Sequence, residues 1–191
     1  MLAEYQITLP AQTIETAEPK GKALLEAAQT NLGFIPNMYA NMVNSPGFLE
    51  AYMTGYASFR NDSGFTAPEQ EVVFLTISRE NGCEYCVSAH SFLADMKSKL
   101  APEVTDAIRD GTPIADGKLA ALAAFTKTMI NARGLPSRTN TEAFLAAGYS
   151  ERQILEIVLA IAVKTLSNYA NHLFHTPLDQ VFAGRRWSDK G

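Results

Sequence analysis

The chain has 191 residues, of which 47% are hydrophobic and 19% are charged, and its formal net charge is −4 at pH 7. This length fits one compact domain with a sizeable core, or two small repeats that share a core. The acidic balance and the lack of a Lys/Arg-rich run argue against nucleic acid as a partner. The sequence shows no signal-peptide pattern, and its longest apolar stretch, residues 154–163, is too short to span a bilayer. We therefore expect a soluble, cytoplasmic protein with no membrane partner.

The first third of the chain predicts an extended arm followed by helices. Residues 1–18 contain proline and several threonines and favour the arm. Glycine and proline residues then separate three helical segments, at 20–31, 37–43 and 47–60. The third segment has an aromatic stripe at helical spacing, formed by Phe48, Tyr52, Tyr56 and Phe59. Such a stripe is typical of a core or a subunit interface, although it could also wall an apolar pocket.

The next stretch predicts a helical hairpin. Thr66 and Glu69 have the spacing of a capping box, so a helix should begin there. Asn81-Gly82 predicts its end, because glycine readily adopts a positive φ. Nothing in residues 83–96 breaks a helix, so a second helix should run over that range.

Both cysteines of the chain lie in this hairpin, as the C-x-x-C pair Cys83 and Cys86. At a spacing of i, i+3 they are neighbours on a helix and close enough for a disulfide. His90 follows Cys86 by four residues and shares its face. Glu71 and His90 lie about equally far before and after the turn, so an antiparallel hairpin brings them side by side. The spacing therefore predicts a line from Glu71 through His90 to Cys86.

These residue types suit a thiol–disulfide redox centre. A free cysteine is mostly thiol at neutral pH, and a helix N-terminus and a nearby imidazolium both favour the thiolate. Histidine can accept the thiol proton and return it to a leaving group, and a carboxylate on its other nitrogen fixes the tautomer. A thiolate can attack a peroxide oxygen, and a second cysteine can condense with the resulting sulfenic acid. This chemistry requires no metal and no other cofactor.

Other readings of the cysteine pair remain open. With His90 and one further ligand, the pair could form half of a zinc site, although a second ligand pair is missing from the sequence. The cysteines could also be two ordinary buried residues. A thioredoxin-like module is disfavoured, because its C-x-x-C lies in a βαβ setting and no such alternation is seen here.

The last part of the chain predicts further helices and an internal repeat. Three helical segments are expected at 102–109, 116–132 and 141–147. From Ser150 onward, residue n+85 echoes residue n, so that Glu71, Cys83, Cys86 and His90 correspond to Glu156, Asn168, Asn171 and His175. A duplicated helical hairpin explains this pattern most simply, and its two copies should pack together. We expect the asparagines and His175 to hydrogen-bond backbone at a buried helix start rather than to contact substrate.

The motif E-x₁₁-C-x-x-C-x₃-H resembles that of the alkylhydroperoxidase D / carboxymuconolactone decarboxylase superfamily, especially its peroxidase-related branch. The segments LGFIPNMYANMVNSPGFLEAY and LSNYANHLFHTPLD extend the resemblance to roughly residues 20–180. The resemblance implies one all-α, alkylhydroperoxidase D-like domain over residues 1–191, with 184–191 as a tail, that forms a homo-oligomer. It makes Cys86 the attacking thiol, Cys83 the resolving thiol, and Glu71 and His90 the proton relay. One position departs from the best-known members, since Tyr85 stands where they have a histidine.

The function that we expect is that of a thiol-dependent peroxidase. A hydroperoxide would be reduced through the dithiol/disulfide cycle, and an unidentified thiol or dithiol would restore the enzyme. One alternative is a carboxymuconolactone decarboxylase-type lyase, whose chemistry uses no cysteine pair. The other is a non-enzymatic module that senses redox state or binds metal. A basic-aromatic cluster at 185–187 is expected to be an exposed end or a subunit contact.

Overall fold

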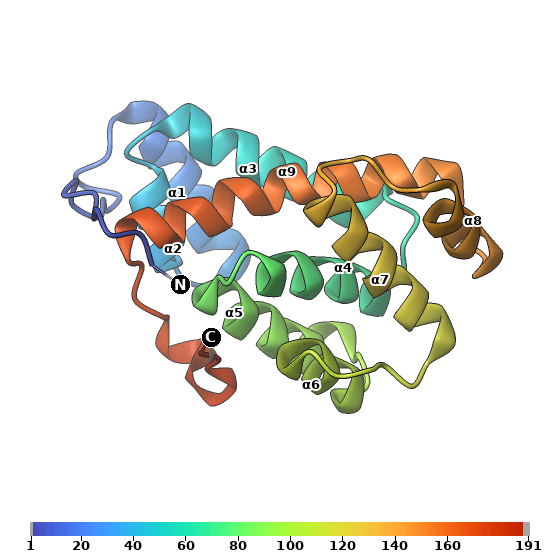
Figure 1. Cartoon of the computed structure of the whole chain (residues 1–191). Helices are drawn as coiled ribbons and strands as arrows, with labels where there is room; N and C mark the ends of the chain where they lie inside the picture. Colours follow the sequence, from blue (N-terminus) through green and yellow to red (C-terminus); the bar gives the residue numbers. More distant parts are fainter. Residues whose placement is uncertain (1, 189–191) are drawn as a thin grey trace.

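Within residues 2–188, which the computed structural model of the protein describes, every regular element is a helix (Figure 1). This confirms the predicted all-α class. In chain order the elements are α1 (Pro19–Leu32), α2 (Asn37–Met42), α3 (Pro46–Asp62), α4 (Ala67–Glu80), α5 (Glu84–Leu93), the π-helix η1 (Ala94–Ser98), α6 (Pro102–Asp110), α7 (Gly117–Asn131), α8 (Arg138–Ala146), α9 (Glu151–Phe174) and the 3₁₀-helix η2 (Gln180–Arg185).

Helix α4 is the central element of the fold. It packs against α5, α6, α7 and α9, and Figure 1 shows it between α9 on one side and α5 and α6 on the other. Ten consecutive residues of α4, at 69–78, are buried. A helix surrounded by others buries side chains on every face, and residues 72–77 of α4 are accordingly apolar except for Thr76.

The predicted hairpin of α4 and α5 is present. Thr66 and Glu69 cap the start of α4 reciprocally: Glu69 N donates to Thr66 Oγ1, and Thr66 N donates to Glu69 Oε2 at 2.8 Å. Gly82 has a φ of +64° and reverses the chain after α4. Cys83 then takes the N-cap position of α5, so that the two cysteines lie at the start of the second helix.

The second helix of the hairpin differs from the expectation for residues 83–96. Its α-helical part ends at Leu93, and Ala94–Ser98 forms a π-helix. A π-turn holds an extra residue, so it rotates the side chains that follow relative to an α-helix. Ser98 is thereby placed against Glu71, to which its hydroxyl donates at 3.2 Å.

The start of α8 was also predicted incorrectly. The sequence suggested a helix that begins only at residue 141. Instead Ser137 is the N-cap, and it forms a capping box with Asn140. Serine disfavours the interior of a helix but caps its start, and the second property decides this position.

The expected second hairpin does not form. Ser150 and Gln153 make the predicted capping box, but residues 151–174 then continue as the single helix α9. At the positions that correspond to Asn81-Gly82, the chain has Leu166-Ser167. This pair has no glycine to reverse the chain, so nothing ends the helix there. The prediction of a repeated hairpin was therefore wrong, although both copies begin with the same type of cap.

The two ends of the described chain pack against different helices, the N-terminal segment against the end of α9 and the C-terminal segment against the end of α6. The N-terminal segment has no helix before α1, and Ala3 N and Ile7 N donate to the carbonyls of His172 and Leu173. At the other end, Trp187 Nε1 donates to the carbonyl of Arg109.

The basic cluster at 185–187 is therefore not simply an exposed end. Arg185 forms salt bridges with Asp95 and Asp106, which anchor η2 to the hairpin side of the molecule. The rest of the predicted tail, residues 189–191, lies outside the described residues. No helix within residues 2–188 is both long enough and apolar enough to cross a membrane.

Candidate active site

The hairpin places Glu71 and His90 in direct contact. His90 Nδ1 lies 2.8 Å from Glu71 Oε2, and both side chains are buried. A carboxylate only accepts hydrogen bonds, so Nδ1 carries the proton and Nε2 presents its lone pair. The sequence predicted this juxtaposition from the spacing of the two residues about the turn.

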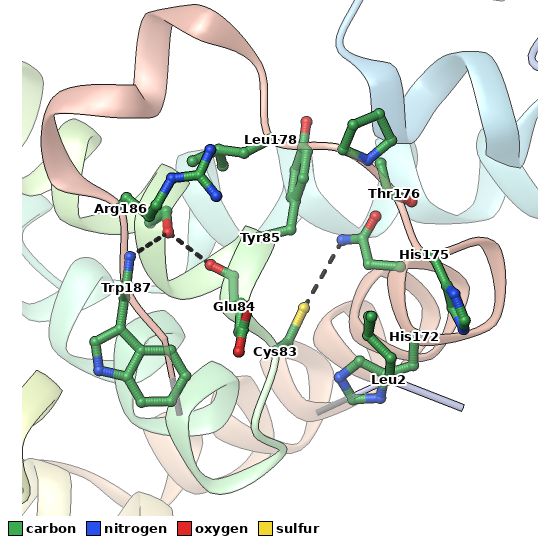
Figure 2. Close-up of a pocket in the computed structure, with 13 residues that line it drawn as sticks. Leu2, Cys83, Glu84, Tyr85, His172, His175, Thr176, Leu178, Arg186 and Trp187 are labelled. Carbon is green, nitrogen blue, oxygen red and sulfur yellow. Dashed lines mark hydrogen bonds between the residues drawn. The ribbon is translucent and has the colours of Figure 1, made fainter. Parts of the chain in front are cut away.

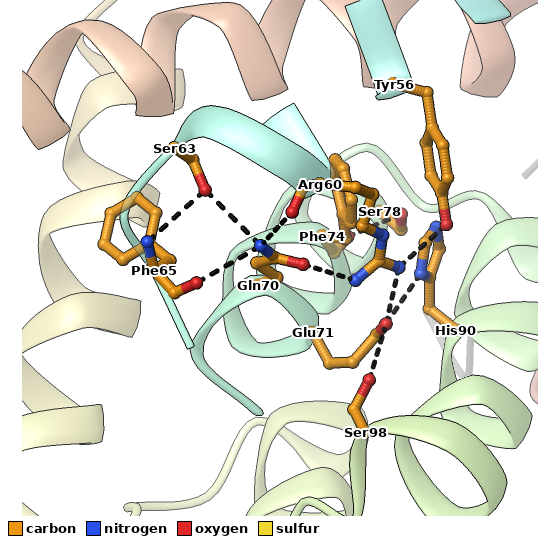
Figure 3. A network of polar contacts seen from close by, with 10 residues as sticks. All are labelled: Tyr56, Arg60, Ser63, Phe65, Gln70, Glu71, Phe74, Ser78, His90 and Ser98. Carbon is orange, nitrogen blue, oxygen red and sulfur yellow. Dashed lines mark hydrogen bonds and ion pairs between the residues drawn. The ribbon is translucent and has the colours of Figure 1, made fainter. Parts of the chain in front are cut away.

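Arg60 completes the surroundings of Glu71 and was missed in the sequence analysis (Figure 3). Its guanidinium contacts Glu71 Oε1 at 2.5 Å, Tyr56 Oη at 2.8 Å and Gln70 Oε1 at 3.1 Å. Arg60 follows Tyr56 by four residues, so it extends the face of α3 that holds the aromatic stripe. This spacing is the feature of the sequence that could have pointed to Arg60. It does not show that this face of α3 packs against Glu71.

The protonation states of this group follow from burial and charge. Burial raises the pKa of Glu71, but His90 and Arg60 outweigh it and hold that pKa below its usual value. Burial and the Lys164 ammonium lower the pKa of His90 to about 4, although Glu71 opposes them. At pH 7 His90 is therefore neutral, and its Nε2 is a base. The predicted imidazolium beside the thiol is absent at that pH.

The two thiols differ in acidity. Burial raises the pKa of Cys83 well above its usual value, and the neighbouring Cys86 raises it further. Burial also works against a Cys86 thiolate, but the hydrogen bond from Cys83 and the Lys164 ammonium prevail and hold the pKa of Cys86 well below its usual value. Cys86 also lies in the first turn of α5, where the helix dipole favours an anion.

Lys164 supplies the positive charge that the sequence analysis assigned to an imidazolium. This α9 residue is only 1% exposed, and its Nζ lies 5.6 Å from the Phe74 ring centroid. It directly follows the apolar run 154–163 and precedes Asn168 and Asn171 by four and seven residues. That spacing puts the three polar side chains on one face of α9, and it was the sequence signal for Lys164.

The two asparagines of α9 contact the hairpin through side chains rather than backbone. Asn171 Nδ2 lies 3.3 Å from Cys86 Sγ and 3.8 Å from Cys83 Sγ, so one amide reaches both sulfurs. Asn168 Oδ1 accepts from Asn81 Nδ2 at 2.9 Å and holds the turn between the helices. Backbone partners were expected for both asparagines and for His175. Of these three residues His175 has one, since its Nε2 lies 2.7 Å from the Ala3 carbonyl oxygen.

Tyr85 has a positional role. Its hydroxyl donates to Asp179, whose carboxylate also accepts from Asn37 N at 3.1 Å. Burial and the Asp179 charge raise the pKa of Tyr85 above its usual value, so it is no base at neutral pH. The residue instead ties the start of α5 to the C-terminal segment and to α2.

Cys86 lines an apolar cavity of about 410 Å³, together with His90 and Lys164. Tyr52 and Tyr56 of the aromatic stripe form part of its wall, as one of the sequence interpretations suggested. His90 makes no hydrogen bond to Cys86 within residues 2–188, so a bound molecule would have to join the base and the thiol.

Cys83 lines a different cavity, of about 150 Å³ (Figure 2). Asn171, His172 and Trp187 contribute to that cavity, where Asn171 Nδ2 lies 3.8 Å from Cys83 Sγ. The paired cysteines thus face two separate cavities. No group of three or more His, Cys, Asp or Glu side chains arranged to hold a metal ion occurs in the described part of the chain.

The sequence of the central region matches a known family. Residues 46–128, which include all four candidate residues, match the sequence model of the Carboxymuconolactone decarboxylase family. This match covers less than half of the chain, and it shows that the central region resembles that family. No curated protein sequence matches the chain.

Solved structures share its alkylhydroperoxidase D-like fold. A peroxidase-related protein with an alkylhydroperoxidase D core from Ralstonia eutropha JMP134 aligns with a TM-score of 0.80 at 22% identity, covering 91% of this chain and 93% of that one. A peroxidase-related protein from Silicibacter sp. TM1040 aligns with a TM-score of 0.78 at 19% identity, covering 96% and 97%. The debrominase Bmp8, as a cysteine-to-alanine variant with 2,3,4-tribromopyrrole, aligns with a TM-score of 0.74 at 18% identity, covering 95% and 96%. At such identities the likeness shows the fold alone.

Proposed function

We propose that the protein is a thiol-dependent peroxidase in which Cys86 attacks and Cys83 resolves. The observation that supports this most is the placement of Cys86 in the first turn of α5, with Asn171 Nδ2 3.3 Å from its sulfur and Cys83 at the N-cap beside it, which favours a Cys86 thiolate next to a second thiol. A low pKa supplies the nucleophile at neutral pH, and a neighbouring thiol supplies the partner for a disulfide. The apolar cavity beside Cys86 suits the organic part of a hydroperoxide.

The proposed reaction has two steps. The Cys86 thiolate attacks the outer oxygen of a hydroperoxide ROOH, the O–O bond breaks, and the alkoxide takes up one proton to leave as ROH. Cys86 is then a sulfenic acid. Cys83 attacks its sulfur, the S–O bond breaks, and water leaves as the disulfide forms. The sum is ROOH plus two thiols giving ROH, water and one disulfide.

His90 and Glu71 act as the proton relay in this proposal. The neutral Nε2 of His90 carries a proton between the thiol and the departing alkoxide. Glu71 orients the ring through Nδ1, and Arg60 keeps Glu71 ionised. Glu71 is a positioning residue here, because it contacts His90 Nδ1 and does not itself line the cavity.

The reductant would reach Cys83 rather than Cys86. Cys83 lines the smaller cavity, which offers an external thiol a route that does not cross the substrate cavity. Attack on Cys83 expels Cys86, whose low pKa makes it the better leaving group. The reductant is expected to be a small thiol or dithiol, or a partner protein that presents one.

Free-thiol titration with a hydroperoxide tests the proposal. One equivalent of cumene hydroperoxide should remove two thiols per chain, and a dithiol should restore them. The His90→Gln variant should react more slowly, by about 10²-fold for loss of a general acid–base group. A loss of no thiols, or of only one without disulfide formation, would contradict the cycle.

The alternatives make different predictions for the cysteines. A lyase of the carboxymuconolactone decarboxylase type would keep its activity when Cys83 and Cys86 are both replaced by serine. A metal-binding module would contain stoichiometric zinc after purification under reducing conditions. A redox sensor would form the disulfide but would not turn over hydroperoxide in the presence of excess thiol.

A second candidate function is reductive dehalogenation of an aromatic ring. It is favoured by the aromatic-walled cavity at Cys86 and by the debrominase among the similar folds. The balanced reaction converts a ring C–Br bond and two thiols into C–H, bromide, a proton and a disulfide. Bromide release from tribromopyrrole, measured beside hydroperoxide turnover, distinguishes the two candidates.

We also propose that the protein is a homo-oligomer. Leu155, Val158 and Tyr169 of α9 are 70%, 47% and 53% exposed. They lie along one outer stripe of a single helix, at spacings of three and eleven residues. An apolar stripe of this kind is suited to bury against a second copy.

A further inference from the structure

Lys164 is a buried cation without an acidic side chain as a partner. Its side chain is 1% exposed, and its Nζ lies 5.6 Å from the centroid of the Phe74 ring. No Asp or Glu within residues 2–188 forms a salt bridge with it. Burying a charge is costly, so buried charges are normally paired. The nearby anion is the Cys86 thiolate, and that charge disappears when the sulfur is oxidised.

The cavity beside Lys164 remains positive even when the thiolate is counted. Two lysines line it, Lys164 in the interior and the exposed Lys97, and none of its lining residues is Asp or Glu. His90 is neutral at pH 7 because burial and Lys164 lower its pKa to about 4. One thiolate therefore balances one of two ammonium groups, and the cavity is suited to a ligand with negative charge.

Hydrogen-bond donors add to this preference. Tyr39, Tyr52 and Tyr56 line the cavity, and burial raises the pKa of each, so their hydroxyls stay protonated. Most of the remaining wall is apolar, formed by Leu32, Phe34, Phe92, Leu93, Val181 and Phe182. The volume of about 410 Å³ lies at the lower end of the range for small-molecule sites.

We infer that this cavity takes an acidic organic molecule, with a compact apolar body and a carboxylate or comparable oxygen anion that pairs with Lys164 beside Cys86. The aromatic walls contact the body, and the lysine ammonium and tyrosine hydroxyls donate to the anion. The inference names the substrate class of the candidate site. It rests on the proposed function for the claim that the bound molecule reacts, whereas the binding can be tested without any redox chemistry.

The test uses 2-naphthoate and its neutral isostere 2-naphthamide. Calorimetric titrations are made on the full chain with Cys83 and Cys86 both replaced by serine, so that no thiolate competes and no oxidation occurs. The acid should bind about tenfold more tightly than the amide, as expected for one charge-assisted contact in a buried site. Adding Lys164→Met should abolish that preference, whereas adding Lys97→Met should leave most of it.

One further variant and a folding control keep the result decisive. Lys164→Arg retains the charge and should retain part of the preference, while thermal unfolding establishes that each variant is folded. Equal binding of acid and amide to the parent, or an unchanged preference in folded Lys164→Met, overturns the inference. If the acid is preferred over the amide but hydroperoxide consumes no thiols in the wild-type chain, the proposed function is contradicted and the acid-binding inference is not. If hydroperoxide consumes two thiols but acid and amide bind equally, the acid-binding inference is contradicted and the proposed function is not.

Discussion

At the scale of single residues, a lysine and a histidine divide the work that a single imidazolium was expected to do. Lys164 provides the positive charge beside the Cys86 thiol, and His90 provides a neutral base. The two roles conflict within one histidine, because a charged ring cannot accept a proton. Separating them allows thiolate and base to coexist at pH 7.

Replacing the charge should therefore change the titration of Cys86. In wild-type protein the thiolate absorbance near 240 nm should disappear only at a pH well below the usual cysteine pKa, since Lys164 and Cys83 stabilise the anion. Lys164→Met should shift that midpoint upward by one unit or more, roughly the effect of a nearby opposite charge. The exposed Lys97→Met serves as control. A midpoint that is the same in wild type and Lys164→Met would contradict the role of Lys164.

Glu71 should contribute more to stability than a carboxylate whose cationic partner is half-exposed. Glu71→Gln leaves the Arg60 guanidinium, whose side chain is only 19% exposed, without its anion, and breaking a buried pair costs roughly 3–5 kcal/mol. Glu69→Gln is the matched control, because Glu69 pairs with the half-exposed Lys118 and glutamine can keep the cap. Urea unfolding should show a loss several times larger for Glu71→Gln. Adding Arg60→Met to Glu71→Gln should recover part of the loss.

The low pKa of His90 predicts a stability that falls on acidification. The unfolded chain takes up a proton at His90 near pH 6.5, whereas the folded chain does so near 4. Between these values the unfolded state binds more protons, so the unfolding free energy should drop by about 1.4 kcal/mol per pH unit at most. Urea unfolding from pH 7 to pH 4.5 measures the slope. His90→Gln should flatten it, and an equal slope in that variant would contradict the assignment.

At the scale of the elements, local sequence signals placed most helices but not their irregularities. The caps at Thr66 and Ser150 and the turn at Gly82 each have a side-chain or backbone cause confined to a few residues, so the sequence reveals them. The π-helix Ala94–Ser98 has no such local signature. It places Ser98 against Glu71, a residue 27 positions earlier in the chain. A contact of that range cannot be read from a local sequence pattern.

The tie between α5 and the C-terminal segment gives a prediction at this scale. Tyr85→Phe removes the donor to Asp179 and should cost about 1–2 kcal/mol, as for loss of a hydrogen bond to a charged group. The C-terminal segment after α9 should then be cleaved faster in limited proteolysis. The rate of thiol oxidation by hydroperoxide should change little, because Tyr85 is no base. A large loss of rate with an intact segment would indicate a chemical role instead.

At the scale of the whole molecule, α9 joins the site to the outer surface. Its buried face supplies Lys164, Asn168 and Asn171 to the hairpin, while its outer stripe exposes Leu155 and Tyr169. A surface that covers this stripe would also support the helix that positions the lysine. Oligomer formation and site geometry would then share one element.

Charge on the outer stripe should dissociate the proposed oligomer. The wild-type chain should show a mass that is a multiple of 20.8 kDa by light scattering after size-exclusion chromatography. Leu155→Glu with Tyr169→Glu should reduce it to 20.8 kDa, because the glutamates would be buried unpaired at the contact. Leu135→Glu, at a position that is 80% exposed outside α9, is the control. A monomeric wild type would contradict the proposal.

The sequence by itself determined the helical class, the hairpin and the meeting of Glu71 with His90, because caps, a glycine turn and helical spacing are local rules. It could not show that Arg60, Lys164 and Asn171 converge on this hairpin, since they come from α3 and α9, and their approach depends on how helices pack. The repeat was misjudged for the same reason, as similar side chains recur in α9 without the turn that would make a second hairpin. The acidity of Cys86 was decided only in the tertiary structure, because one lysine from a distant helix and the hydrogen bond from Cys83 together outweigh its burial.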